Sequence, residues 1–403
     1  MAAQQYPAPE SVSRLQQRAF LVGGIALLVS ILGTFYMHTP ELFYQSYLMS
    51  FMLILGLTVG SLGLLMLQHL TSGQWGIIIR RSLESATRTL PLLVIAFLPI
   101  VLFGMHYLYS GHGDEKGWLN APPTGEGALS DFQKSYLTPN GFYTRAAVYF
   151  AVWLVLMFIF NILSKQQDAN PEDRALRLRF KMLAGPGLIL YVFMMTFASF
   201  DWVMSLSPHW ASTIYGFLFV AGQLISAMAF MIAVVVLLSR TEPFASVLQK
   251  RHLHDLGKLL LAFVMLWAYF DFSQLLIIWS GNLPEEITFY RTRLYGGWGA
   301  VAVLVLVFHF FVPFFLLLSQ DVKRNARVLP KIALWLIFMR LVDLFWMTRP
   351  EFTSRALPSW LDIVLPLGLG GLWLALFAFN LKQYPLLPIG DPNLEETLEQ
   401  HEH

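Results

Sequence analysis

Seven ionisable side chains lie within or at the ends of long apolar stretches of this sequence. They are Asp201, Asp271, Asp343, Arg340, His309, His69 and His106. A charge at membrane depth costs at least a few kcal/mol unless it is paired or hydrated, and such residues mark functional sites by default. Carboxylates and imidazoles in this setting can pass protons. The set therefore predicts a proton path through the apolar part of the protein.

Two members of the set are close neighbours in sequence. Arg340 and Asp343 are three residues apart, so a helix places them on one face. They form either a structural ion pair or a pair in which Arg340 favours the ionised form of a proton-exchanging Asp343. Asp271, in WAYFDFSQ, has the polar Ser273 and Gln274 beside it. It is either a proton relay or a buried acid held by hydrogen bonds.

Composition indicates that much of the surface meets lipid. Of the 403 residues, 56% are hydrophobic and only 13% are charged. In soluble domains, roughly a quarter of the residues are charged. A net charge of +2 argues against a nucleic-acid partner. The absence of cysteine excludes disulfides and iron–sulfur clusters held by cysteines of this chain. No cleavable secretory signal is evident in the first twenty residues, so we expect the N-terminus to be retained.

Ten stretches are long and apolar enough to cross a membrane, which takes about 20 residues. They predict an all-α polytopic protein with cytoplasmic tails at 1–18 and 381–403. The longest outer loop, 109–141, is rich in Gly and Pro and is expected to be an ordered or partner-bound loop without regular structure. The expected spans are 19–36, 46–69, 88–108, 142–163, 184–205, 212–238, 255–279, 294–318, 329–347 and 361–380.

The distribution of Lys and Arg gives an orientation. With both termini in the cytoplasm, the inner segments hold 19 basic residues and the outer segments hold 7, counting Arg145 at a helix mouth. Arg340 lies inside a span. The basic run NPEDRALRLRFK at 170–181 is then inner topogenic charge that also reaches lipid head groups.

This orientation assigns a depth to each ionisable residue. The three acids fall in the outer half, whereas His309 and His69 fall in the inner half and His106 lies at the outer end of its span. Asp201, in SFDWVMSLSPHW, either handles protons or caps the helix that follows. His309 is either a relay or a hydrogen-bonded core residue. No two of the histidines share a depth, so we expect no haem held by this chain.

Three pairs of similar short segments indicate an internal repeat. Asp201 precedes Pro208 by seven residues, and Asp343 precedes Pro350 by the same interval. LYSG and IWSG end the third and seventh spans, and FYTR and FYRTR open the fourth and eighth. The two members of each pair lie four spans apart, in spans that cross the membrane in the same direction. They predict two similar four-helix bundles related by an axis along the membrane normal, with a working site near their interface. The bundles are 46–205 and 212–347, flanked by spans 19–36 and 361–380.

Two stretches carry a resemblance to a known family. TFASFDWVMSLSPHWASTIYGFLFVAGQ at 196–223 and YFDFSQLLIIWSGNLPEE at 269–286 resemble the membrane subunits of alternative complex III. These are ten-span relatives of the NrfD-like polysulfide-reductase membrane anchors. The likeness runs from about the second span to the tenth and is greater to the shorter membrane subunit, quinone-binding subunit 2.

The resemblance implies a place in a quinol:acceptor oxidoreductase of the bacterial inner membrane. Quinol or menaquinol would be the substrate, bound mainly by a sister ten-span subunit. Haem c and iron–sulfur clusters would lie in periplasmic multihaem cytochrome and iron–sulfur partner subunits, with a terminal oxidase as a further partner. This chain would bind no cofactor and would not catalyse alone. The family proton-path role would transfer to Asp201 and Asp271.

Two other classes of function remain open. A purely structural scaffold for the peripheral redox subunits would use the acids only as ion pairs. A secondary transporter also has repeats and buried acids, although the sequence lacks a matching pair of Gly-rich unwound segments. No sequence pattern of a metalloprotease, a phosphate-binding loop or a serine hydrolase occurs.

Overall fold

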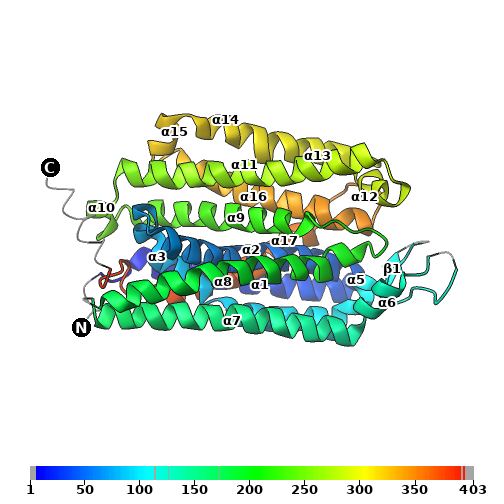
Figure 1. Cartoon of the computed structure of the whole chain (residues 1–403), viewed down its shortest axis with the longest axis horizontal. Helices are drawn as coiled ribbons and strands as arrows, with labels where there is room; N and C mark the ends of the chain where they lie inside the picture. The colour runs from blue at the N-terminus through cyan, green and yellow to red at the C-terminus, as the bar shows by residue number, and fades with distance from the viewer. Residues whose placement is uncertain (1–5, 113–114, 126, 172, 392–393, 395–403) are drawn as a thin grey trace.

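The computed structural model describes residues 6–391 and Leu394, apart from 113–114, 126 and 172. Within this part of the chain, nine helices are long and apolar enough to cross a membrane. Figure 1 shows them lying side by side along the long axis of the molecule. The chain is thus a mainly helical fold of membrane type, in agreement with the predicted all-α polytopic class.

Most of these helices extend beyond the expected apolar segments. Their bounds are α1 (Glu10–Met37), α2 (Pro40–Thr71), the run α3 (Gln74–Thr87), α4 (Leu90–Pro99), η2 (Ile100–Gly104) and α5 (Met105–Tyr109), then α7 (Pro139–Ala169), α8 (Arg174–Trp202) with η3 (Met204–Leu206), α9 (Tyr215–Leu238), α11 (Lys250–Gly281), the run α13 (Trp298–Val305), η4 (Leu306–Phe311) and α14 (Val312–Leu318), and α17 (Leu361–Leu381). The elements η2 and η4 are π-helical.

The remaining expected span, 329–347, is also a helix, α16 (Leu329–Thr348). This helix is not counted among the nine apolar helices because it carries three charged residues, Lys331, Arg340 and Asp343. Shorter helices connect the long ones: α10 (Phe244–Val247), α12 (Pro284–Leu294), α15 (Gln320–Arg324) and η5 (Arg349–Glu351).

The outer loop 109–141 is more regular than its composition predicts. It contains a short antiparallel hairpin and the short helix α6 (Asp131–Tyr136). The strands of the hairpin, β1 (Gly111–His112) and β2 (Glu115–Lys116), have two residues each. A capping box begins α6, because Ser130 Oγ accepts from the Gln133 N–H and the Gln133 side chain accepts from the Ser130 N–H. The expectation of no regular structure was therefore wrong for these segments.

Helix α2 forms the centre of the molecule. It is buried along most of its length and packs against α3, α8, α9 and α17. The peripheral helices instead expose large apolar side chains, such as Phe20 on α1 and Phe272 on α11, each more than 60% accessible. An apolar exterior of this kind suits lipid, not water.

The two ends of the described part of the chain lie at one end of the helix bundle. The N–H of Leu386 donates to the carbonyl of Tyr6 at 3.0 Å, and the first and last described residues lie at the left in Figure 1. The hairpin and α6 lie at the opposite end. This placement agrees with an even number of crossings.

The contacts between helices are reciprocal across the two predicted bundles. Helix α2, the first of one bundle, packs on α9, the first of the other. Helix α8 contacts α9, and α16 contacts α2, so the last helix of each bundle touches the first helix of the other. The two-bundle division stays a prediction, and these are contacts that it requires.

The flanking helices α1 and α17 are held together through glycine. A Cβ at Gly23 would lie 2.6 Å from the backbone nitrogen of Leu372, and one at Gly371 would lie 2.6 Å from Gly23 Cα. Small residues at such crossings allow backbones to approach closely, which is a main source of helix association in lipid.

We predict that Gly23→Ala lowers the thermal stability of the detergent-purified protein, with a penalty of about 1–3 kcal/mol for overpacking. Gly24→Ala is the matched control, because a Cβ there meets nothing within 4 Å. A thermal melt followed by intrinsic fluorescence measures both. Equal melting temperatures for the two variants would contradict the close contact.

Candidate functional site

The predicted pair on α16 is present and buried. The Arg340 guanidinium donates to the Asp343 carboxylate one turn away, and both side chains are almost inaccessible. The guanidinium also lies 5.4 Å from the centre of the Phe219 ring on α9. A Cβ at Gly222 would overlap the guanidinium, so this glycine makes room for Arg340.

His309 lies in the π-helix η4, in the middle of an otherwise α-helical span. Its ring is fully buried and packs at 4.5 Å, edge to face, against Trp267 of α11. Neither ring nitrogen has a hydrogen-bond partner among the described residues. π-Helical turns inside helices occur frequently at functional sites, and a buried imidazole without a partner is poor as a purely structural residue.

Asp271 is half-buried on α11 and makes no hydrogen bond or ion pair with any described residue. One turn on, Gln274 is buried and lies 3.2 Å from Ser212 Oγ and 3.4 Å from the Tyr290 hydroxyl. Tyr290 belongs to α12, at the end of the helices that carries β1 and α6. Burial raises the pKa of Tyr290, and the negative charge of Asp271 raises it further.

These residues converge in the second predicted bundle. The turn η4, which carries His309, packs against both α11 and α16, the helices of Asp271 and of the Arg340–Asp343 pair. Carboxylates, an imidazole and a guanidinium from α11, η4 and α16 therefore share one interior region. Two of them, Asp271 and His309, lack hydrogen-bond partners in the part of the chain described, which leaves them available for a proton or water.

Asp201 lies apart from this group, in the first predicted bundle. Its carboxylate accepts two hydrogen bonds from Arg145 at 2.8 Å and one from the Tyr149 hydroxyl at 2.6 Å. The carboxylate does not cap the following helix, which was the alternative drawn from SLSPHW. Because its oxygens are occupied and it is completely buried, the geometry is that of a structural ion pair.

A cavity of about 390 Å³ opens beside this ion pair, at the end of the helices where α6 lies. Ligand pockets start at about 300 Å³. Tyr136 of α6 lies on its wall, with its ring 3.8 Å from the Arg145 guanidinium carbon. Burial raises the pKa of Tyr136 to about 12, with a further contribution from the charge of Asp201. The wall is mostly aromatic and apolar: Phe132, Tyr136, Phe197, Phe200, Met204 and Trp210.

The remaining two predicted residues lie at opposite ends of the helices. His69, near the end of α2, is 7% exposed and stacks on Phe180 at 4.1 Å. His106, in α5, is exposed, and its Nδ1 lies 3.0 Å from Ser110 Oγ. Neither lies near the group around Arg340, so the structure does not join all seven residues into one path.

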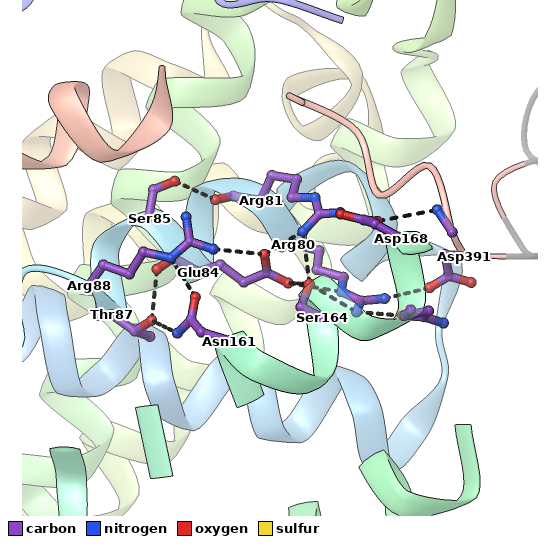
Figure 2. Close-up of polar contacts among 12 residues, drawn as sticks. Arg80, Arg81, Glu84, Ser85, Thr87, Arg88, Asn161, Ser164, Asp168 and Asp391 are labelled. Carbon is purple, nitrogen blue, oxygen red and sulfur yellow. Dashed lines mark hydrogen bonds and ion pairs between the residues drawn. The ribbon is translucent and has the colours of Figure 1, made fainter. Parts of the chain in front are cut away.

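The most extensive ionic cluster was not predicted as a site. Figure 2 shows three arginines of the helix run that begins at α3 gathered around Glu84. Glu84 accepts from Arg80 at 3.1 Å and from Arg81 at 2.8 Å, and Ser164 donates to it at 2.7 Å. Beyond Glu84, Arg81 binds Asp168 and Arg80 binds Asp391. Arg88 lies 3.6 Å from Glu84 and donates to Asn161 at 2.6 Å.

The cluster joins α3, α7 and the segment after α17 into one network. Three guanidinium groups face three carboxylates, so its net charge is zero. The expected spans 46–69 and 88–108 leave Arg80, Arg81 and Glu84 in the inner segment between them. The helix instead begins at Gln74 and buries them. Their spacing at i, i+1 and i+4 could have indicated a helix face, but the partners Asp168 and Asp391 lie too far along the chain to be inferred.

No metal site or family assignment adds to this picture. Among the described residues, no group of three His, Asp or Glu side chains converges as metal ligands do. Neither a family model nor a curated protein matches the chain. The function is therefore argued from the geometry of the site.

We predict that Glu84→Gln strongly destabilises the protein. The change leaves three buried arginines with two carboxylates, and breaking a buried pair in this way costs about 3–5 kcal/mol. Thermal stability in detergent and accumulation in membranes measure the loss. Glu84→Asp retains the charge and should recover part of it. Asp255→Asn, which removes only a surface ion pair with Lys258, should have little effect. A stable Glu84→Gln protein would mean that the cluster is not charge-balanced as described.

Proposed function

We propose that this chain is a membrane subunit of a respiratory quinol:acceptor oxidoreductase and that it contributes a proton path. The path would use Asp271, Asp343, Arg340 and His309. The chain itself would hold no redox cofactor, and electrons would pass through partner subunits.

The observation that carries this proposal is the unsatisfied group in the second bundle. The imidazole of His309, in a π-helical turn that packs against α11 and α16, is buried and has no hydrogen-bond partner among the described residues. Asp271 of α11 also makes no hydrogen bond with any of them. Groups kept only for structure are normally paired, as Asp201 is with Arg145. Free carboxyl and imidazole groups can take up and release protons, which a rigid ion pair does poorly.

The family resemblance supplies the rest of the proposal. The stretches around Asp201 and Asp271 resemble membrane subunits of alternative complex III. The proposal therefore includes ten crossings, cytoplasmic termini and the bacterial inner membrane. It also includes a sister quinol-binding subunit, with haem c and iron–sulfur subunits on the outer side and a terminal oxidase as a further partner. The bias of 19 inner to 7 outer basic residues supports this orientation.

A structural scaffold is the second candidate, and one observation favours it. Asp201 was one of the predicted proton-path acids, but both of its carboxylate oxygens accept hydrogen bonds from Arg145 or Tyr149. If Asp271 and Asp343 were equally inert, the chain would serve only to hold peripheral subunits. The two candidates differ in what they predict for Asp271.

We predict that Asp271→Asn lowers proton release while the complex still assembles, because the amide keeps the shape of the side chain and cannot ionise. The measurement is quinol oxidation together with proton movement, using the purified complex in vesicles. Asp255→Asn is the matched control, since it makes the same change on the same helix at a partly exposed position, where the carboxylate pairs with Lys258. Unchanged proton release would support the scaffold, and loss of assembly would show that Asp271 is structural.

A second variant tests the inner part of the path. We predict that His309→Phe also lowers proton release, because phenylalanine keeps the packing on Trp267 but removes both ring nitrogens. The same vesicle assay applies, with the level of assembled complex as the control. Normal proton release in His309→Phe would remove this residue from the path.

A further inference from the structure

Two cations of α8 stand outside the balanced ionic cluster. Arg177 and Lys181 are one helical turn apart, and both are exposed. Neither forms an ion pair with any described residue. Every charge in the neighbouring Arg80–Glu84 cluster, by contrast, has a partner of opposite sign. The pair therefore adds two positive charges that are not compensated within the described part of the chain.

A small cavity lies between these cations and the interior. Its volume is about 40 Å³, and residues of α2, α3, α7 and α8 line it together with Asp391. By the same measure a water needs about 10–15 Å³, so the cavity has room for about three waters or for a small polar group. The Asp391 carboxylate on its wall is bound by Arg80 at 2.8 Å, which offsets its charge.

The cavity wall also carries two buried polar atoms without partners. They are Oε1 of Gln68 and Nε2 of His69, on side chains that are 3% and 7% exposed. Stacking on Phe180 at 4.1 Å fixes the plane of the His69 ring. A neutral imidazole can donate from Nε2, and an amide can present its NH₂ group at this position. Buried polar atoms left without partners point to an absent ligand.

We propose that this cavity binds a phosphate group, that of an anionic lipid. Arg177 and Lys181 would contact the phosphate oxygens at the mouth, and His69 Nε2 would donate to one of them from inside. Charge-assisted hydrogen bonds of this kind are about twice as strong as neutral ones. Basic pockets between membrane helices on the cytoplasmic side typically bind anionic head groups. The site lies at the end of the molecule where the termini meet, and it does not depend on the redox role proposed above.

The test is the phosphorus content of the full-length, detergent-purified protein. After extensive washing, the organic extract reports bound phospholipid and the aqueous phase reports free phosphate. We expect the wild type to retain one phospholipid per chain that Arg177→Gln/Lys181→Gln loses. Arg177→Gln alone is compared with Arg179→Gln, which removes an exposed charge from the same helix but does not line the cavity.

A second variant separates the site from general adhesion of lipid to basic residues. His69→Phe keeps the stack on Phe180 and removes the donor, so it should weaken retention without changing the surface charge. Phosphorus found only in the aqueous phase, and lost in the same variants, would also support the site, with free phosphate as the ligand. Equal phosphorus content in the wild type, the double variant and His69→Phe would overturn the proposal.

Discussion

A charge removed from water must meet an opposite charge or a full set of hydrogen bonds, and this requirement organises the interior of the protein. Lipid is as apolar as the helix surfaces, so apolar contact alone does little to select partners among them. Ion pairs here join helices that are distant in sequence: Arg145 of α7 binds Asp201 of α8, and Arg349 after α16 lies 3.4 Å from Asp362 of α17. The Glu84 cluster likewise joins α3 to α7 and to the segment after α17.

The two predicted bundles meet this requirement differently. In the first, the arginine at the helix mouth, Arg145, takes the buried acid Asp201 as its partner. In the second, the corresponding Arg293 binds Glu351 at 2.7 Å, so Asp343 pairs within its own helix with Arg340. This difference leaves Asp271 and the His309 ring without such partners in the described chain. The two predicted bundles thus differ in their ion pairs: the first pairs its acid between two helices, and the second pairs Asp343 within one helix.

Local patterns in the sequence predicted what depends on neighbouring residues. The lengths of apolar segments gave the helices, and the spacing of three gave the Arg340–Asp343 pair. Contacts between distant residues could not be obtained in this way, because Arg145 and Asp201 are 56 residues apart. The π-helical turn around His309 has no sequence signal that we recognised. The Glu84 cluster was missed because its residues are charged, and charge was taken as evidence for a loop when a buried partner made a helix possible.

The glycine contact between α1 and α17 also has a consequence for how the protein is made. Helix α1 is synthesised long before its main partner, α17. Until residues 361–381 have been synthesised, the surface around Gly23 has only lipid, or a helper protein, to cover it. Helix α1 therefore waits in the membrane while the helices between it and α17 are synthesised, and its docking on α17 can be a late step of biogenesis.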